Sequence, residues 1–234
     1  MTQRMAKSKK ASSEKRRIPK RRSTSRRATI RLLLTGFGPF PGAPVNPTGA
    51  LIRALKRKLR SQPDIQIDTH VFRTTYRAVD RELPHLLARQ KPDALLMFGL
   101  ATRSRGFRIE TQARNRICRH PDAAGVVPDM HKIAEDAPRT LPIHAPKAAL
   151  LRAARSGSLS ARLSVNAGDY LCNYLYWRAL EAARHSGGPD RAVFIHVPPL
   201  DDQKVPRSKR TMDNLVVTAE AIAKALVKAA RRRR

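Results

Sequence analysis

The sequence predicts a single α/β domain of three layers, in which helices cover both faces of a mainly parallel, twisted sheet. Segments with strand character alternate along the chain with segments of helical periodicity, and this alternation is typical of α/β folds. Several strand segments are apolar throughout, which indicates strands buried on both faces. The chain has 234 residues, 41% of them hydrophobic, so it can bury a core of the required size.

Six segments carry strand character. The first, TIRLLLTG, is an apolar run that ends in a turn, and a loop rich in glycine and proline follows it. DALLMFGL and RAVFIHVPPL read as fully buried strands, whereas FRIETQARN is expected to be a strand or sheet edge that leads into a loop. The stretch 116–142 contains four prolines and is predicted to be irregular. The six strand segments are 29–36, 65–72, 93–100, 107–115, 161–166 and 191–200.

Five helices are expected between and after these strands. Thr48 is predicted to cap the first helix, and Asp169 is a plausible cap for the fourth. Pro84 is expected to kink the second helix. The last helix has apolar residues at helical spacing, and its terminal arginines complement the negative end of the helix dipole. The predicted helices are 48–60, 77–89, 145–155, one that begins close to Asp169, and a C-terminal helix that contains Leu215, Ala219, Ile222 and Leu226.

The charge is strongly basic and unevenly distributed. The formal net charge is +30, and residues 1–30 hold twelve Lys or Arg against a single acid, Glu14. Such runs of basic residues are usually solvated and disordered. If they have a function, it is non-specific attraction to polyanions. We therefore predict a basic disordered arm at 1–28, an α/β domain at 29–230, and an arginine tail at 231–234.

Several classes of protein are disfavoured. Two cysteines, Cys118 and Cys172, cannot build a disulfide framework, so a reducing, cytoplasmic location is expected. No apolar run approaches the roughly 18 residues of a membrane span, so no membrane partner is expected. No HxxH or CxxC pair is present, and GFGPFPG lacks the glycine order of a dinucleotide fingerprint, so neither a metal nor another cofactor is predicted.

Three residues near strand ends or helix starts could take part in catalysis. Cys172 falls in the first turn of a predicted helix, where free N–H groups stabilise a thiolate; the alternative is a small buried hydrophobe. His196 ends an apolar run and could act as a general base, or could be a hydrogen-bonded structural histidine. Glu110 could orient an imidazole, or could form a surface ion pair in this basic chain.

Together these segments resemble the pyroglutamyl peptidase I family, also called pyrrolidone-carboxylate peptidases. LLTGFGPFPGAPVNPT is similar to the opening strand and loop of the family, and KPDALLMFGLA to its central strand. IETQARN, RHPDAAG and TLPI resemble the family's glutamate segment, arginine segment and a later loop. VNAGDYLCNYLYW and FIHVPPLDDQ resemble the segments of the family's nucleophile and histidine. The resemblance extends from about Arg31 to Gln203.

The resemblance implies a cysteine exopeptidase that removes N-terminal pyroglutamate from peptides. Cys172 would be the nucleophile, His196 the base and Glu110 the residue that orients the imidazole. Arg119 would help the N–H groups at the start of the Cys172 helix to hold the oxyanion. Because pyroglutamate is a flat, uncharged lactam, aromatic rings would suit it. The expected substrate-binding residues are Phe37, Phe40, Asn46, Leu100 and Tyr170.

Two alternatives stay open at this point. One is a basic nucleic-acid-binding protein that uses the same fold as a scaffold. The other is a homologue with altered specificity or lost activity, because Asp169 stands where the family usually has threonine and ATRSR replaces a glycine-rich loop. The sequence is compatible with a homo-oligomer.

Overall fold

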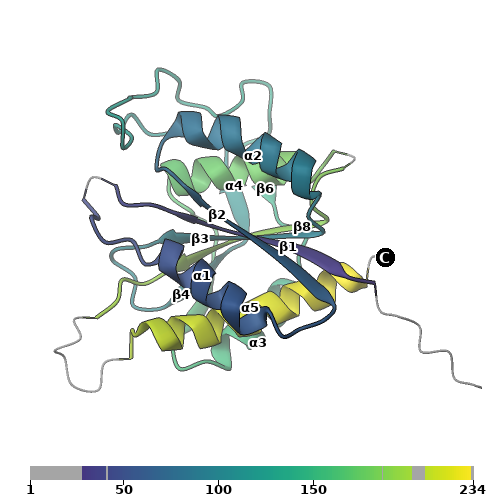
Figure 1. The fold of residues 1–234 in the computed structure, drawn as a ribbon. Coiled ribbons are helices and arrows are strands. Elements are labelled where there is room, and N and C mark those ends of the chain that lie inside the picture. The colour runs from purple at the N-terminus through teal and green to yellow at the C-terminus, as the bar shows by residue number, and fades with distance from the viewer. Residues whose placement is uncertain (1–27, 41, 186, 202–208, 233–234) are drawn as a thin grey trace, which may run out of the picture.

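A six-stranded sheet lies between two layers of helices (Figure 1), which confirms the predicted three-layer α/β/α fold class. The structure is a computed structural model that describes residues 28–40, 42–185, 187–201 and 209–232. The predicted basic arm therefore lies, apart from Ala28, outside the described residues.

Four strands of the sheet are parallel, and the remaining two run in the opposite direction. The strand order is β2-β1-β3-β8-β4-β7, and β1, β2, β3 and β8 run parallel to one another. β4 pairs antiparallel with β8 and parallel with β7. The sheet is therefore mainly parallel, as predicted. Its strands are β1 (Ile30–Phe37), β2 (Ile65–Phe72), β3 (Ala94–Leu100), β4 (Phe107–Glu110), β7 (Ala161–Ser164) and β8 (Arg191–Val197).

A second, two-stranded sheet lies beside the main one. It pairs β5 (Gln112–Arg114) antiparallel with β6 (Thr140–Pro142). β6 lies in the stretch 116–142 that we expected to be irregular, so the prediction was wrong at this point. Three residues are too few to show alternation in the sequence, and the strand exists because a distant segment supplies its hydrogen-bond partners.

The helices divide between the two faces of the sheet, and each layer buries its own core. α2 and α4 cover one face, whereas α1, α3 and α5 cover the other (Figure 1). Leu51, Leu55 and Leu226 belong to the core under α1 and α5, and Leu83 and Leu175 to the core under α2 and α4. The helices are α1 (Thr48–Leu59), α2 (Tyr76–Gln90), α3 (Lys147–Arg155), α4 (Leu171–Ala182) and α5 (Met212–Arg231).

Neither predicted helix cap is present. Thr48 is the first residue of α1 rather than its cap, and the cap residue Pro47 makes no side-chain hydrogen bond. The cap of α4 is Tyr170 rather than Asp169, again without a side-chain bond. Tertiary contacts override the local preference at Thr48, because its buried hydroxyl bonds to the backbone of Phe37.

Glycine allows this contact between β1 and α1. A Cβ atom on Gly36 would lie 3.0 Å from the carbonyl group of Thr48, which is closer than most real contacts. Asn46 completes the junction, because its amide donates to the carbonyl of Gly38 and accepts from the N–H of Thr48. The loop that follows β1 is therefore held from both of its ends.

The second and last helices add two details to the sequence predictions. α2 contains Pro84 and continues through it to Gln90. α5 ends at Arg231, whose guanidinium bonds to the carboxylate of Asp64, so the first arginine of the C-terminal run is part of the helix. None of the helices described here is long and apolar enough to cross a membrane.

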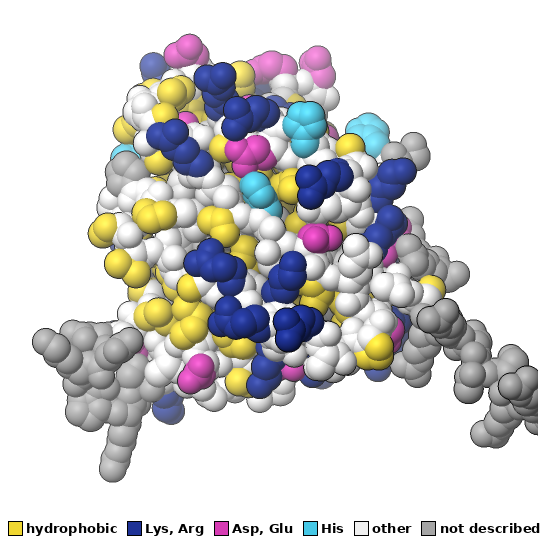
Figure 2. All heavy atoms as spheres, viewed as in Figure 1, with side chains coloured by type: hydrophobic (Ala, Val, Ile, Leu, Met, Phe, Trp, Pro, Cys, Tyr) yellow, Lys and Arg dark blue, Asp and Glu magenta, His cyan; other side chains and the backbone are white. Residues whose placement is uncertain are grey.

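Basic side chains cover much of the described surface. Figure 2 shows Lys and Arg spread over this face of the molecule, with one group below the centre of the view, where Figure 1 places α1. The last turn of that helix alone contributes Lys56, Arg57 and Lys58.

We expect Thr48→Val to destabilise the fold by about 1–3 kcal/mol, because valine keeps the shape of threonine but leaves the buried N–H of Phe37 without an acceptor. Urea unfolding would measure the change. Thr69→Val in β2 is a suitable control, because its half-buried hydroxyl makes no hydrogen bond to a described residue. Equal effects of the two substitutions would contradict the role given to Thr48.

Candidate active site

Strands β4 and β8 bring three charged or titratable side chains to one face of the sheet. Side chains alternate between the two faces of a strand, so Arg108 and Glu110 share a face of β4. By the same rule, Phe194 and His196 share a face of β8. The antiparallel register sets Arg108 opposite His196 and Glu110 opposite Phe194. Phe194 packs in the core under α2 and α4, so all four side chains point toward that layer.

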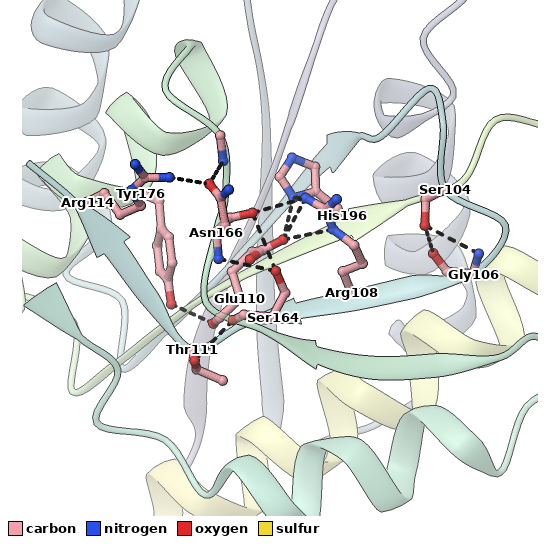
Figure 3. Close-up of polar contacts among 11 residues, drawn as sticks. Ser104, Gly106, Arg108, Glu110, Thr111, Arg114, Ser164, Asn166, Tyr176 and His196 are labelled. Carbon is pink, nitrogen blue, oxygen red and sulfur yellow. Dashed lines mark hydrogen bonds and ion pairs between the residues drawn. The ribbon is translucent and has the colours of Figure 1, made fainter. Parts of the chain in front are cut away.

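Glu110 forms the centre of a buried polar cluster (Figure 3). Its Oε1 atom lies 2.8 Å from Nδ1 of His196, and the two residues are 0% and 4% exposed. The same oxygen accepts from Arg108, at 3.1 Å from Nε and 3.0 Å from the terminal nitrogen. The arrangement confirms that Glu110 and His196 are in contact, as a catalytic pair requires.

The chemistry of the carboxylate fixes the tautomer of the imidazole. A carboxylate only accepts hydrogen bonds, so Nδ1 of His196 carries the proton and donates it to Glu110. Burial lowers the pKa of His196 below its ordinary value of 6.5; the contact with Glu110 opposes this shift, and the Arg108 charge adds to it. His196 is therefore neutral at pH 7, and its Nε2 atom is free to accept a proton.

Cys172 lies next to this pair, in the first turn of α4. A Cβ atom on Gly99 would approach Sγ of Cys172 to 2.7 Å, so the sulfur rests on the backbone of β3 at that residue. Gly99 is the register partner of His196 in the parallel pair of β3 and β8, and partners in register point to the same face. The thiol and the imidazole therefore lie on the same face of two adjacent strands.

The Cys172 thiol is protonated in the resting protein. Burial raises its pKa from 9.0 to about 12; the charge of Glu110 adds to the rise, and Arg108 opposes it. Asp169 is not among the causes: its side chain is 43% exposed and pairs with Arg116 at 3.8 Å. The acid that opposes a thiolate at this site is therefore the buried Glu110 rather than its nearer neighbour in sequence.

Helix α4 also holds the strand that carries Glu110. The hydroxyl of Tyr176 donates to the backbone carbonyl of Glu110 at 2.7 Å (Figure 3). The fully buried amide of Asn173 accepts from the N–H of Arg114 and donates to the carbonyls of Arg114 and Arg116. The helix of Cys172 and the strand of Glu110 are thus joined by hydrogen bonds as well as by packing.

The loop before α4 is tied to the same cluster through Asn166 (Figure 3). The backbone carbonyl of Asn166 accepts from Arg108 at 3.2 Å, and its side-chain oxygen accepts from Arg114 and from the N–H of Gly168. Gly168 has φ +86°, a conformation that glycine adopts without strain. The loop can therefore turn sharply into α4.

Aromatic rings gather at the start of α4. The ring of Tyr170 lies 6.4 Å from that of Phe40, 6.0 Å from that of Tyr76 and 5.7 Å from that of His120. The Tyr170 hydroxyl donates to the carbonyl of Pro121. Tyr76 is buried, whereas the half-buried rings of Phe40 and Tyr170 and the exposed ring of His120 could contact a flat ligand.

The remaining predicted site residues have different surroundings. Phe37 is 2% exposed and packs on Phe72, so it supports the loop from within the core. Leu100 is buried at the end of β3. Asn46 bonds to the loop that follows β1, as described above. Arg119 is exposed, and its side chain makes no hydrogen bond or ion pair with any described residue.

Two functional residues were missed by the sequence analysis. Arg108 lies within the predicted strand 107–115, and only the strand register reveals that it faces His196. Gly99 was part of a strand motif, and the nearness of the Cys172 sulfur reveals its importance. The alternation of Arg108 and Glu110 along one strand was the signal available for the arginine.

In the part of the chain that the structure describes, no group of three or more His, Cys, Asp or Glu side chains is placed to hold a metal ion.

Comparison with known proteins agrees with this geometry. The family model described as pyroglutamyl peptidase matches residues 30–232. The pyrrolidone-carboxylate peptidase of Thermococcus onnurineus is 31% identical over 203 residues, which are 86% of this chain and 100% of that protein. The enzyme of that name from Thermococcus litoralis is 34% identical over 176 residues, which are 75% of this chain and 79% of that protein.

Solved structures give the same result. The pyrrolidone carboxyl peptidase of Thermococcus litoralis aligns with a TM-score of 0.79 and 29% identity, over 88% of this chain and 97% of that one. A mutant pyrrolidone carboxyl peptidase from Pyrococcus furiosus aligns with a TM-score of 0.78 and 26% identity, over 86% of this chain and 100% of that one. By sequence match and by fold, this chain belongs to the pyroglutamyl peptidase family of cysteine peptidases.

Proposed function

We propose that this protein removes N-terminal pyroglutamate from peptides, with Cys172 as nucleophile, His196 as general base and acid, and Glu110 as the residue that orients the imidazole. The observation that supports this most directly is the buried contact between Glu110 and His196. The Cys172 thiol lies close to this pair and packs against Gly99. Family membership supports the choice of substrate.

Catalysis begins from a neutral thiol and a neutral imidazole. The thiol pKa of about 12 and the lowered imidazole pKa disfavour a preformed ion pair. Sγ of Cys172 therefore attacks the carbonyl carbon of pyroglutamate as its proton moves to Nε2 of His196. The imidazolium that forms is stabilised by Glu110, whose Oε1 atom already accepts from Nδ1.

The proton then leaves with the departing amine. As the tetrahedral intermediate collapses, the C–N bond breaks and the imidazolium protonates the amine of the shortened peptide. A water molecule next gives one proton to His196 while its oxygen attacks the thioester. The C–S bond breaks, the proton returns to Sγ, and pyroglutamate leaves as the free acid.

The start of α4 would stabilise the oxyanion of the intermediate. The cap residue Tyr170 offers no side-chain acceptor, so the first N–H groups of the helix, around Cys172, lack a capping partner. Such groups, at the positive end of a twelve-residue helix, are suited to a developing negative charge. We propose that exposed Arg119 assists from solvent.

The rings of Phe40 and Tyr170 are proposed to hold the lactam. Their centroids are 6.4 Å apart and the rings are tilted by 52°, whereas a flat ligand between them needs about 3.5–4.0 Å on each side. Substrate binding would therefore slightly increase the distance between the two rings. The backbone at Leu100 is proposed to pair with the lactam amide, and Asn46 to hold the loop that carries Phe40.

We propose a cytoplasmic location, which suits a catalytic thiol because reducing compartments keep cysteines free. Both Cys118 and Cys172 are unpaired here. A homo-oligomer and non-specific binding of polyanions through the basic ends of the chain also belong to this proposal.

Hydrolysis of a chromogenic pyroglutamyl amide tests the function. Cys172→Ser should lower kcat by roughly four orders of magnitude or more, because the triad acts as a unit. Cys118→Ser is the matched control and should retain most activity. The glutamyl amide should be a poor substrate, because its charged groups would have to be desolvated against aromatic walls. Activity that depends on Cys118, or equal cleavage of both amides, would refute the proposal.

The two charged neighbours of His196 should move the pH profile in opposite directions. Arg108 lowers the pKa of His196, so Arg108→Gln should shift the ascending limb of kcat/KM to higher pH. Glu110 raises that pKa, so Glu110→Gln should shift the limb to lower pH and also slow the reaction. In the unchanged protein the limb should lie below pH 6.5. Shifts in the same direction would contradict the electrostatic roles.

Gly99→Ala should lower kcat/KM by about 100-fold or more, because the new methyl group would displace the nucleophile and a displacement of about 1 Å can have an effect of that size. The methyl group would lie 2.7 Å from both Sγ of Cys172 and the ring of Phe194. Gly49→Ala is the control, because its nearest contacts are ordinary ones at 3.5 Å. The rate of thiol alkylation should change with Gly99→Ala, and an unchanged rate with full activity would refute the placement.

A further inference from the structure

A second candidate site lies at the end of the sheet where the parallel strands begin. The active site lies at the opposite end, where these strands finish. A pocket is formed where the start of α3 meets the last turns of α5, beside the first residue of β8. We call it the basic edge pocket. Its lining includes Pro146, Ala149, Arg152, Arg191, Lys228 and Arg232.

The basic edge pocket combines four permanent cations and one histidine with no carboxylate in its lining. Arg152, Lys228 and Arg232 form no ion pair with any residue that the structure describes. Arg191 donates from one terminal nitrogen to the carbonyl of Asp190, and its buried Nε atom has no hydrogen-bond acceptor among the described residues. Like charges that share a pocket repel one another, and a bound anion would relieve this repulsion.

Some basic side chains elsewhere in the described chain pair with acids. At the same edge of the sheet, Arg31 pairs with Asp93, and Arg231 pairs with Asp64. In the groove near β5, Arg116 pairs with Asp169. None of the residues that line the basic edge pocket is an acid, so its cations have no such partner within the lining.

The start of α3 adds further donors. Its cap residue Pro146 makes no side-chain hydrogen bond, and its first turn contains no acid. Pro146 and Ala149 both line the pocket, so the unpaired N–H groups of this nine-residue helix lie at its wall. Backbone N–H groups at a helix start and arginine side chains are the usual partners of phosphate oxygens in proteins.

Both ends of the described chain lie along this edge. The N–H of Ile30 and the guanidinium of Arg231 bond to the same residue, Asp64, and Figure 1 shows the start of β1 beside the end of α5. The sequence 1–27, with twelve Lys or Arg, and the last two arginines therefore connect to the domain here. An extended polyanion could contact the pocket and these cations together, which a single small anion could not.

We propose that the basic edge pocket binds phosphate groups of a nucleic-acid backbone, without sequence preference. Arg152, Arg191, Lys228 and the N–H groups of α3 are the donors to the phosphate oxygens. Contacts of this kind release condensed counterions, so they set the salt dependence of binding rather than its sequence specificity. The site is separate from the peptidase chemistry, because Cys172 and His196 lie at the other edge of the sheet.

Fluorescence anisotropy with a labelled DNA duplex and the full-length protein tests this proposal. Each lost phosphate contact should reduce the slope of log K against log salt by about 0.9, so Arg152→Gln/Lys228→Gln should reduce it by about 2. The control Arg77→Gln/Arg81→Gln removes the same charge from exposed positions on α2, which covers the other face of the sheet, and should leave the slope nearly unchanged. Lys228→Gln alone should give half the effect.

Three results would overturn the proposal. Equal loss in the pocket and control variants would mean that only total charge matters. An unchanged slope in the pocket variant would assign all binding to the chain ends. If the pocket variant weakened binding of a heparin fragment but not of the duplex, the partner would be a sulfated polysaccharide. Both pocket substitutions are at exposed positions, and matching unfolding temperatures would confirm that the fold is intact.

Discussion

The Glu110 carboxylate is completely buried, and a buried charge is strongly unfavourable unless it is paired and hydrogen-bonded. Arg108 and His196 supply that pairing through a single oxygen, Oε1. The other oxygen, Oε2, has no hydrogen-bond partner among the described residues. The pairing therefore determines how the neighbouring residues are arranged. It sets the tautomer of His196 and places Arg108 against the imidazole. The charge of Glu110 also adds to the effect of burial, which raises the pKa of the Cys172 thiol.

The direction of β4 explains why the carboxylate is so deeply buried. In parallel sheets, functional residues gather beyond the carboxyl ends of the strands. β4 runs against β8, so its first residues lie at that edge and Glu110 lies deeper, opposite Phe194. Arg108 is left nearer the surface, with its side chain 22% exposed. From there it partly offsets the effect of the carboxylate on both the thiol and the imidazole.

The sequence predicted the layers of the fold because long apolar runs and helical periodicity are local features. β1, β3 and β8 are continuous apolar strands, and the structure has them where they were expected. Strand register, by contrast, depends on residues far apart in the chain. Register sets Arg108 opposite His196, and it also places Gly99, which the Cys172 sulfur contacts, beside His196. Neither arrangement could be predicted from the sequence segments alone.

Local rules also failed where tertiary contacts offered better partners. Thr48 has the chemistry of a helix cap, but its buried hydroxyl is used by the backbone of Phe37. Phe37 looked like a ring available to substrate and instead packs on Phe72 in the core, 2% exposed. Resemblance to a family named the three residues of the triad, and the physical reason for their grouping became visible only with the paired strands.

Distance explains how a chain with a net charge of +30 keeps a neutral thiol. β1 spans eight residues from the basic edge of the sheet toward the catalytic edge, which is about 26 Å at roughly 3.3 Å per residue. Charges in solvent are screened over about 8 Å at physiological salt. Burial and the adjacent Glu110 therefore outweigh the distant cations and raise the pKa of Cys172, although a positive field alone would lower it. One end of the parallel strands can therefore hold a protonated thiol while the other end holds cations that no described acid neutralises.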